Sequence, residues 1–522
     1  MPFRRLSAML SSFPQTAAFM LGILSVYALP PFHIFPILFV SFSGLFCLLE
    51  KTADTAPKAW KLGYAFGFGH FAFGLSWIGN ALLLDASAFG WLYPLCLLAG
   101  GAFFGLFTAL PLWLSYYFKP LIARILAFAG FWGFSEWLRS FVLTGFPWNL
   151  LGSVFAFSDT MLQTASLWGT YGLSLITILI SSFPALYLSN PQKRNLLPAA
   201  GIPALLLLLL FGIGFFRLSA AVQTAGETTV RLVQPAIPQA MKWDRNALEY
   251  NFQKYIALSR TAGLDKIDFV VWGETAVPFP LDVDKEHRQA ITAAIPADGY
   301  LITGLVRYEG KPDGGYTPFN SMFVINKQGE IIAHYDKTHL VPFGEYIPLK
   351  QYLPDWIRPV ANTIANFGTG SGPQTLSIKN FPELSASICY EIIFPYQVIN
   401  RQKKPEWMIN LTNDGWYGDS MGPYQHLTAA RLRAVEEGIT IIRAANSGIS
   451  AAISPYGQVI AAIPLNIQNI MDIRLPAEAS VFTFYNKHGN NIPIALYLFN
   501  IILACYISQR NDKNMKKKQI QQ

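Results

Sequence analysis

The sequence predicts a multi-span α-helical membrane domain joined to an extramembrane α/β domain. Two observations support this fold class: an uneven distribution of apolar and charged residues, and a change of pattern near residue 218. Of the 522 residues, 52% are hydrophobic and 13% are charged, and the mean hydropathy is +0.32. The first 220 residues are poor in charge, whereas residues 226–490 have an ordinary charge content. We therefore expect a membrane part and a globular part.

Long apolar runs predict the membrane-spanning helices, because a helix needs about 20 residues to cross a hydrocarbon layer roughly 30 Å thick. Seven runs near this length precede the polar region and an eighth follows it, at about residues 14–30, 33–50, 60–83, 88–116, 122–141, 162–189, 197–215 and 491–507. The fifth run is weakened by Glu136 and Arg139. A soluble helical bundle is the alternative, but LLLLLLFGIGFF (205–216) offers water no polar face.

These runs divide the chain into three predicted segments. Residues 1–217 form a transmembrane domain of about seven helices, residues 218–490 form the extramembrane domain, and residues 491–522 form a last transmembrane helix with a basic tail. The amino-terminal MPFRR and the apolar run after it are typical of a signal peptide. Because no small-residue cleavage site follows and further spans come at once, we expect an uncleaved first span.

The basic residues predict the orientation of the spans. The net charge is +8. If the amino terminus is cytoplasmic, eight spans bring the carboxyl terminus to the same side. The short segments then assigned inside carry Arg4, Arg5, Lys51, Lys58, Lys61, Lys119, Arg124, Lys193, Arg194, Arg510, Lys513, Lys516, Lys517 and Lys518. The short outside loops carry Arg139 alone, which is the positive-inside bias. No basic surface interleaved with aromatic residues is seen, so nucleic-acid binding is not expected.

This orientation places residues 218–490 outside the cytoplasmic membrane, which in a bacterium is the periplasmic side. That compartment is oxidising, and disulfides are common there. The extramembrane segment nevertheless contains a single cysteine, Cys389, while Cys47, Cys96 and Cys505 lie in apolar runs. Cys389 therefore has no partner in its own domain and is either a buried free thiol or a reactive one.

The extramembrane segment alternates strand-like and helix-like stretches. Strands are expected within residues 229–236, 268–277, 299–308, 320–337, 383–391, 406–414 and 440–463. The two long stretches read as hairpins that turn at KQGE and PYGQ. Helical patterns cover residues 243–263 and 422–438. This alternation predicts a layered α/β domain in which helices cover sheets.

Several kinds of site can be set aside. The seven histidines include no H-E-x-x-H pair, and no Cys/His cluster has zinc-ligand spacing. The glycine-rich FGTGSGP (367–373) lacks the Lys-Ser/Thr pair of a phosphate-binding loop, so a flexible loop is the simpler interpretation. There is no G-x-S-x-G motif.

Three polar residues remain at the ends of predicted strands: Glu274, Lys337 and Cys389. Each alone fits a surface charge or a core thiol. Together they suit acyl transfer, because an ammonium group lowers a thiol pKa from about 8.5 toward neutrality and a carboxylate can take the thiol proton. The ammonium group and the backbone N–H of Tyr390 could hold an oxyanion.

The stretches WGETAVP (272–278), YDKTHLVPFGEYIP (335–348) and CYEIIFP (389–395) resemble the Glu, Lys and Cys signatures of the carbon–nitrogen hydrolase (nitrilase) superfamily. With the membrane spans, the chain resembles the apolipoprotein N-acyltransferase family. The resemblance extends over EWLRSFVLTGFPW (136–148), PQAMKWD (238–244) and LTNDGWYGDSMGPYQHL (411–427). It implies a periplasmic catalytic domain with a nitrilase-like α-β-β-α sandwich, in the bacterial inner membrane.

The resemblance also implies a ping-pong reaction. Cys389 takes an acyl chain from a phospholipid, typically phosphatidylethanolamine, as a thioester, and the α-amino group of a diacylglyceryl-cysteine on an apolipoprotein then accepts it. Glu274 is the implied general base and Lys337 the implied stabiliser of the tetrahedral states. Glu345, Tyr390 and Glu391 are implied to support the site, and the implied lipid-contacting aromatic residues are Trp148, Trp243, Trp416 and Tyr417. For these aromatic residues, anchoring at the membrane interface is the alternative.

No cofactor or metal is expected, because acyl transfer between ester, thioester and amide needs no redox partner. Two other functions remain open. A membrane-tethered amidase or nitrilase would use the same three residues, with water as the second acceptor. A membrane scaffold or transporter with an inactive nitrilase-like domain would be expected to lack one of the three, and would carry more ionisable residues in its spans.

Overall fold

The structure is a computed structural model, which describes residues 12–221, 224–312, 314–348, 350–352, 366–478 and 480–521. Among these residues, those up to 79, those from 87 to 220 and those from 484 onward form one compact unit, here called unit 1. Residues 80–86 and the described residues between 221 and 483 form unit 2.

Unit 1 is helical. Its helices are α2 (Pro14–Val26), α3 (Ile37–Thr52), α4 (Ala56–Gly74), α5 (Ala86–Phe89), α6 (Tyr93–Ser115), α7 (Leu121–Leu138), α8 (Asp159–Leu162), α9 (Ala165–Ser182), α10 (Ala185–Ser189), α11 (Lys193–Leu196), α12 (Ile202–Ser219), α17 (Phe484–His488) and α18 (Asn491–Ile520). Short helical turns lie between them, at η1 (Ser76–Asp85), η2 (Gly90–Leu92), η3 (Val142–Thr144), η4 (Leu151–Phe157) and η5 (Leu197–Gly201). Residues 80–85 of η1 belong to unit 2.

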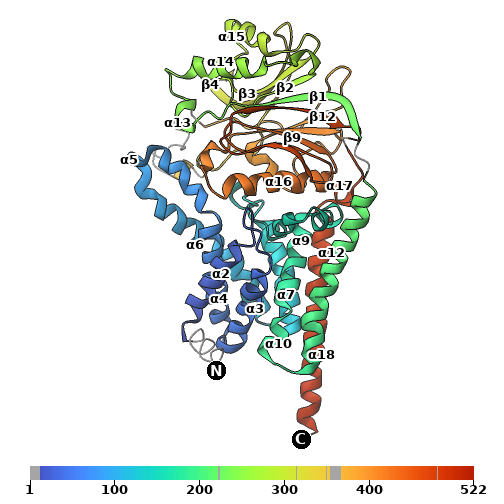
Figure 1. Cartoon of the computed structure of the whole chain (residues 1–522). Helices are drawn as coiled ribbons and strands as arrows, with labels where there is room; N and C mark the ends of the chain where they lie inside the picture. Colours follow the sequence, from blue (N-terminus) through green and yellow to red (C-terminus); the bar gives the residue numbers. More distant parts are fainter. Residues whose placement is uncertain are drawn as a thin grey trace. The chain divides into compact units, whose positions relative to one another are not determined.

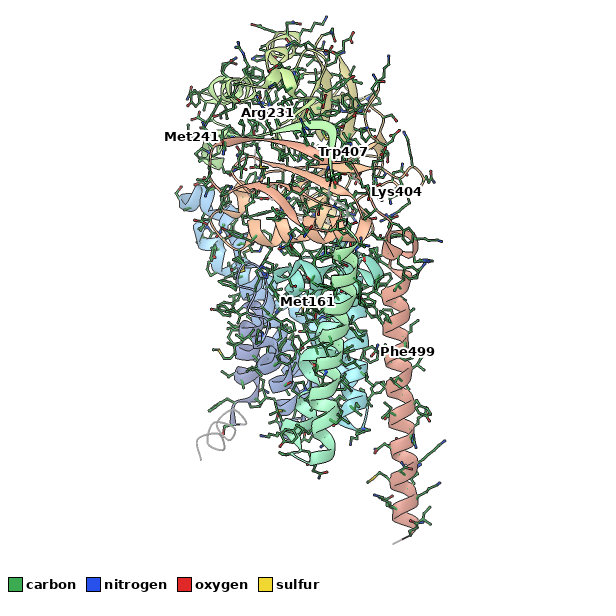
Figure 2. The ribbon with its side chains drawn as sticks, turned by 45° about the vertical axis from the view of Figure 1, so that its right-hand side comes forward. Met161, Arg231, Met241, Lys404, Trp407 and Phe499 are labelled. Carbon is green, nitrogen blue, oxygen red and sulfur yellow. The ribbon has the colours of Figure 1, made fainter. Side chains whose placement is uncertain are left out.

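Each of the eight apolar runs falls on one of these helices, namely α2, α3, α4, α6, α7, α9, α12 and α18. Within the described ranges, five segments are long and apolar enough to cross a membrane: Ser76–Ser115, Leu121–Leu138, Ala165–Ser189, Leu197–Ser219 and Asn491–Ile520. The chain is therefore a membrane protein, and the number of eight spans stays a prediction. Figure 2 shows Phe499 on α18, where its ring is 62% exposed, as expected for a side chain that faces lipid.

Small residues let the helices of unit 1 approach one another closely. A Cβ atom added at Gly22 of α2 would lie 1.9 Å from the carbonyl oxygen of Phe66 on α4. One added at Gly133 of α7 would lie 2.2 Å from the Tyr497 ring of α18. These positions require glycine because a Cβ atom would overlap the neighbouring helix. Such close approach is typical of helices in lipid, which associate by close packing rather than by a hydrophobic driving force.

Unit 2 contains two six-stranded sheets. In the first sheet the strand order is β12-β1-β2-β3-β4-β5, and in the second it is β11-β10-β9-β8-β7-β6. The strands are β1 (Ala225–Gln234), β2 (Phe269–Val271), β3 (Tyr300–Gly310), β4 (Tyr316–Asn326), β5 (Ile331–Asp336), β6 (Thr375–Leu376), β7 (Leu384–Ile388), β8 (Trp407–Thr412), β9 (Thr440–Ala445), β10 (Ser450–Ile453), β11 (Val459–Ile463) and β12 (Asn469–Pro476).

The two sheets have mixed direction. The pairs β1–β2, β2–β3, β7–β8 and β8–β9 are parallel, and the remaining pairs are antiparallel. The β4–β5 and β10–β11 pairs are the two hairpins that KQGE and PYGQ predict. Strands β2, β7, β8 and β9 are buried along their whole length because both of their faces are covered.

Helices cover the outer faces of the sheets (Figure 1). The helices of unit 2 are α13 (Gln239–Lys242), α14 (Leu248–Ser259), α15 (Lys285–Ala290) and α16 (Gly422–Glu437), with short turns η6 (Leu264–Lys266), η7 (Ile291–Ala294), η8 (Lys350–Tyr352), η9 (Cys389–Ile393) and η10 (Asp414–Tyr417). In Figure 1, α14 and α15 lie beyond the first sheet and α16 beyond the second. The layers are therefore α-β-β-α, which confirms the predicted fold class.

The core of unit 2 lies between the two sheets. Phe269 of β2 packs against Trp407 of β8, with ring centroids 5.5 Å apart. A second apolar cluster joins the first sheet to its covering helix, where Tyr255 of α14 stacks on Trp272 at 4.8 Å. Arg231 of β1, labelled with Trp407 in Figure 2, is fully buried and pairs with Asp472 at 2.7 Å.

Candidate active site

Cys389 lies at a strained turn where strand β7 becomes the short helix η9. Its backbone φ is +51°, a left-handed conformation that residues other than glycine rarely adopt. The residue is 5% exposed, and its thiol forms no disulfide. Strain of this kind costs of order 1–3 kcal/mol and persists where the surroundings impose it, often at functional sites.

Glu391 supports this turn from one side. Its Oε2 accepts a hydrogen bond from the backbone N–H of Ile388 at 2.6 Å. Its Oε1 accepts from the backbone N–H groups of Thr338 and His339, at 2.6 and 3.2 Å, and from the hydroxyl of Tyr335 at 2.8 Å. One buried carboxylate therefore ties the residue before Cys389 to the residues that follow Lys337.

His426 of α16 supports the turn from another side. Its Nε2 donates to the carbonyl oxygen of Cys389 at 3.1 Å. Its Nδ1 lies 2.8 Å from Oδ1 of Asp414 and 3.0 Å from Nη2 of Arg443. Burial and Arg443 lower the pKa of His426, so the ring is neutral near pH 7. Because the imidazole bonds the backbone of Cys389, we assign it a positioning role.

Glu274 follows strand β2 and is 6% exposed. Its backbone N–H donates to the carbonyl oxygen of Thr412 at 3.4 Å, and its own carbonyl oxygen accepts from Nζ of Lys242 at 2.8 Å. The next residue, Thr275, has a φ of +44°. The carboxylate of Glu274, like the thiol of Cys389, is therefore presented from a strained turn after a buried strand.

Lys337 directly follows β5, and its side chain is 1% exposed. Its Nζ lies 2.9 Å from Oε1 of Glu345 and 3.5 Å from Oε1 of Glu274. The amide nitrogen of Asn320 donates to the same two oxygens, at 2.8 Å to Glu274 and 2.9 Å to Glu345. Val341 donates its backbone N–H to Oε2 of Glu345 at 2.8 Å. The ammonium group is thus clamped between two carboxylates.

The charges that act on the Cys389 thiol come from Glu274, Lys337 and Asp414. Burial and the negative charge of Glu274 raise the pKa of the Cys389 thiol to about 12, against the opposing effect of Lys337. The expectation that Lys337 would bring this pKa toward neutrality is wrong, because the cost of burying a thiolate exceeds the attraction of one ammonium group that two carboxylates already partner. At rest the sulfur carries its proton.

Lys337 itself stays protonated. Burial opposes its charge, but Glu345 and Glu274 together raise the pKa of its ammonium group above the usual value for lysine. The buried carboxylate of Glu274 shares this ammonium group with Glu345 and is the acceptor that lies beside it.

Tyr417 of η10, one of the predicted aromatic residues, lies near the sulfur. Its hydroxyl is 4.0 Å from Sγ of Cys389, and burial raises the pKa of that hydroxyl, so that it keeps its proton. Its carbonyl oxygen accepts from the side chain of Asn80 at 2.7 Å, in the part of η1 that belongs to unit 2. Trp416 is half-buried beside it.

The remaining predicted residues lie in different places. Tyr390 is buried and packs edge-on against Phe394, with ring centroids 5.2 Å apart. Trp243 is half-buried and follows α13, and the helix predicted to begin there begins at Leu248. Trp148 belongs to unit 1, where its ring is 3% exposed and packs on Trp77 at 4.5 Å.

Several residues of the site were not identified from the sequence. They are Lys242, Asn320, Asp414, His426 and Arg443. Lys242 falls in PQAMKWD, Asp414 and His426 fall in LTNDGWYGDSMGPYQHL, and Arg443 falls in the predicted strand stretch 440–463, but the sequence does not tell which polar side chains of those stretches turn inward. Among the described residues no group of three or more His, Cys, Asp or Glu side chains is placed to hold a metal ion.

Two family models match separate parts of the chain. A family model described as Carbon-nitrogen hydrolase matches residues 229–480, and one described as Apolipoprotein N-acyltransferase N-terminal domain matches residues 21–183. An amidase of solved structure from Nesterenkonia sp. is 20% identical and covers 50% of this chain and 95% of its own, with a TM-score of 0.36. By the two family models, the chain combines a carbon–nitrogen hydrolase domain with the amino-terminal domain of an apolipoprotein N-acyltransferase.

Full-length relatives define the family. The Apolipoprotein N-acyltransferase of Rhodopseudomonas palustris is 36% identical over 511 residues, which is 94% of this chain and 95% of the relative. That of Brucella melitensis is 38% identical over 505 residues, which is 94% of each chain. The chain belongs to the apolipoprotein N-acyltransferase family.

Proposed function

We propose that the protein is a phospholipid-to-apolipoprotein N-acyltransferase that works through a thioester on Cys389. The relatives that match along 94% of the chain carry the name of this activity. The observation that carries the residue assignment is the clamp in which Lys337 lies 3.5 Å from Glu274 and 2.9 Å from Glu345, with Glu274 and Lys337 both acting on the Cys389 thiol.

In the first half-reaction, Sγ of Cys389 attacks the carbonyl carbon of a phospholipid acyl ester. The thiol proton passes to the carboxylate of Glu274, and the tetrahedral oxyanion is held by the ammonium group of Lys337 and the backbone N–H of Tyr390. When the intermediate collapses, the C–O bond breaks and the lysophospholipid oxygen takes the proton from Glu274. The acyl chain remains on Cys389 as a thioester.

In the second half-reaction, the α-amino group of an amino-terminal diacylglyceryl-cysteine attacks the thioester carbonyl. Glu274 takes a proton from the amine, the C–S bond breaks, and the sulfur recovers its proton as the amide forms. The thiol pKa of about 12 fits this cycle, since the protonated sulfur needs a base in the first step and leaves as a thiol in the second. No cofactor takes part.

The remaining roles follow from chemistry and position. Glu345 fixes the ammonium group of Lys337, and Glu391 fixes the turn of Cys389. Tyr417, Trp416 and Trp243 contact the lipid chains of the two substrates, and phosphatidylethanolamine is the donor. Trp148, whose ring is buried against Trp77 in unit 1, is not assigned this role. Residues 218–490 face the periplasm as the catalytic domain of an inner-membrane protein, and both termini are cytoplasmic.

The test uses purified enzyme, a phospholipid with a labelled acyl chain, and a diacylated peptide with a free α-amino group. We expect a labelled amide on the peptide together with lysophospholipid. A Cys389→Ala variant whose melting temperature equals that of the unmodified enzyme should form neither product. Release of free fatty acid at the same rate with and without the peptide would contradict N-acyl transfer and support the hydrolase alternative.

A further inference from the structure

A second lysine, Lys242, points its ammonium group into the same site. It is the last residue of α13 and is 6% exposed, and its Nζ donates to the carbonyl oxygen of Glu274 at 2.8 Å. The segment before it is fixed, because the side chain of Asn446 exchanges two hydrogen bonds with the backbone of Ile237, at 2.8 and 3.1 Å. Lysine is almost never this deeply buried without a compensating partner.

The groups that compensate Lys242 are the reacting ones. Two ionisable groups favour its ammonium form: the carboxylate of Glu274, and Cys389 whenever its sulfur is negatively charged. The same two groups act on Lys337, which faces Glu345 in addition. Two ammonium groups therefore share the general base and the nucleophile.

A charge count shows what the second ammonium group changes. At rest, Lys242 and Lys337 contribute two positive charges, and Glu274 and Glu345 contribute two negative ones. Asp414, which also acts on the thiol, is paired with Arg443 at 2.8 Å. The attack converts the Glu274 carboxylate into a neutral acid and creates an oxyanion. With Lys242 neutral, the buried site would carry an uncompensated negative charge at every stage, and low-dielectric surroundings make such a charge costly.

We propose that Lys242 is a second cation of the active site, which stabilises the negative charge shared by Glu274, Cys389 and the oxyanion during formation of the acyl-enzyme. This proposal rests on the proposed function. It also explains how the strained turn at Thr275 is held, because the same Nζ atom bonds the carbonyl oxygen of the residue before it.

The role of Lys242 has a consequence for pH dependence. Burial lowers the pKa of the Lys242 ammonium group to about 8, against the opposing effects of Glu274 and Cys389, whereas the pKa of Lys337 is raised. Lys242 is thus the ammonium group that loses its proton first as the pH rises. Formation of the acyl-enzyme should slow above about pH 8 for this reason.

The experiment measures the rate at which labelled acyl chains appear on the enzyme between pH 6.5 and 10, with no acceptor peptide present, so that the acceptor amine cannot contribute to the profile. The variants are Lys242→Arg, which keeps the charge, and Lys242→Met, which removes it. The control is Lys285→Met, which removes an exposed lysine of the same unit. Alkylation by iodoacetamide of a variant with Cys389 as its single cysteine gives a readout that is independent of the lipid headgroup.

For the unmodified enzyme and Lys285→Met we expect an alkaline decline with an apparent pKa near 8. Lys242→Met should lower the rate at pH 7 on the order of 10²-fold and lose this decline, and it should slow alkylation of Cys389. Lys242→Arg should keep a larger share of the rate and move the decline upward by more than one pH unit.

An unchanged alkaline decline in either Lys242 variant, or a Lys242→Met rate at pH 7 within threefold of the unmodified enzyme, would overturn the proposal. If Lys242→Met melts below the assay temperature, Lys242→Gln takes its place under the same criteria. Failure of the proposed function looks different, because then the unmodified enzyme itself carries no label on Cys389.

Discussion

Each unit of the molecule buries a cluster of charged side chains, and the two clusters differ in what their charges contact. In unit 2, the ammonium group of Lys337 lies beside two carboxylates, and the charges act on the thiol of Cys389. In unit 1, the guanidinium group of Arg139 donates to the carbonyl oxygen of Trp148 at 2.6 Å and lies over the Phe71 ring at 5.0 Å.

Glu136 of unit 1 likewise contacts main chain and indole rather than a reacting group. Its Oε1 accepts from the backbone N–H of Leu151 at 2.8 Å and from the indole N–H of Trp132 at 3.0 Å. Both of these partners are donors that would otherwise be buried without an acceptor. The Lys337 cluster of unit 2 thus acts on the thiol of Cys389, whereas Glu136 and Arg139 of unit 1 bind main-chain groups.

The largest difference between the two clusters is expected when one glutamate in each, Glu274 or Glu136, is replaced by glutamine. Glu274→Gln removes the base and should lower acyl-enzyme formation on the order of 10³-fold. Glu136→Gln keeps an amide oxygen that can accept both hydrogen bonds, so its rate should stay within a few-fold. The two rates are measured with labelled phospholipid on enzymes matched for melting temperature. Equal losses in the two variants would remove the distinction between the clusters.

A second prediction concerns the charge state of the thiol. Because burial and Glu274 raise the pKa of Cys389 to about 12, the fraction present as thiolate at pH 7 is low. In a variant with Cys389 as its single cysteine, iodoacetamide should react about 10³-fold more slowly than with an ordinary thiol of pKa about 8.5. The rate should rise with pH well above pH 9. The same chain unfolded in detergent is the control, and equal rates in the folded and unfolded chain would contradict a raised pKa.

A third prediction concerns Glu391, whose carboxylate binds the backbone on either side of the site next to Cys389. Glu391→Gln replaces an oxygen that accepts from Ile388, or one that accepts from Thr338 and His339, with an amide donor. We expect a loss of about 10- to 100-fold in acyl-enzyme formation, since misplacement of a nucleophile by about 1 Å has effects of this order. Gln425→Ala, on the neighbouring helix α16, serves as a packing control that leaves these bonds in place. A rate for Glu391→Gln equal to that of the control would show that the turn holds without Glu391.

The smallest effect on rate is expected from Arg139→Met. The carbonyl oxygen of Trp148 then loses its donor, which should destabilise the protein by about 1–3 kcal/mol. Acyl transfer to Cys389 should stay within a few-fold when assayed below the lowered melting temperature. The melting temperature and the labelling rate are measured on the same preparation. A Lys337→Met variant provides the contrast, because it should lose the rate by a far larger factor than Arg139→Met.

The sequence predicted the parts of this account that depend on local pattern. Glu274, Lys337 and Cys389 each follow a short run of strand-forming residues, and the structure places them just after β2, β5 and β7. The eight apolar runs each form a helix, and this could be predicted because it follows from the length and composition of each run without knowledge of its contacts. Glu136 and Arg139, which weakened one of the runs, lie at the end of α7 where they bind the following loop.

The parts that the sequence did not predict depend on contacts between distant segments. Lys242 faces Glu274 across 32 positions of the chain, and Asn320 faces it across 46. Neither spacing follows from periodicity. The charge state of Cys389 was also missed, since it depends on how deeply the thiol is buried and on the carboxylates that already occupy Lys337.

The central claim is that Cys389 itself carries the acyl chain. Purified enzyme is incubated with a phospholipid labelled in its acyl chains, in the absence of acceptor, and the adduct is mapped by mass spectrometry after proteolysis. The account predicts one acyl group on the peptide that contains Cys389, released by neutral hydroxylamine and absent from Glu274→Gln. Label on a different residue, or transfer to a diacylated peptide by Cys389→Ala, would contradict it.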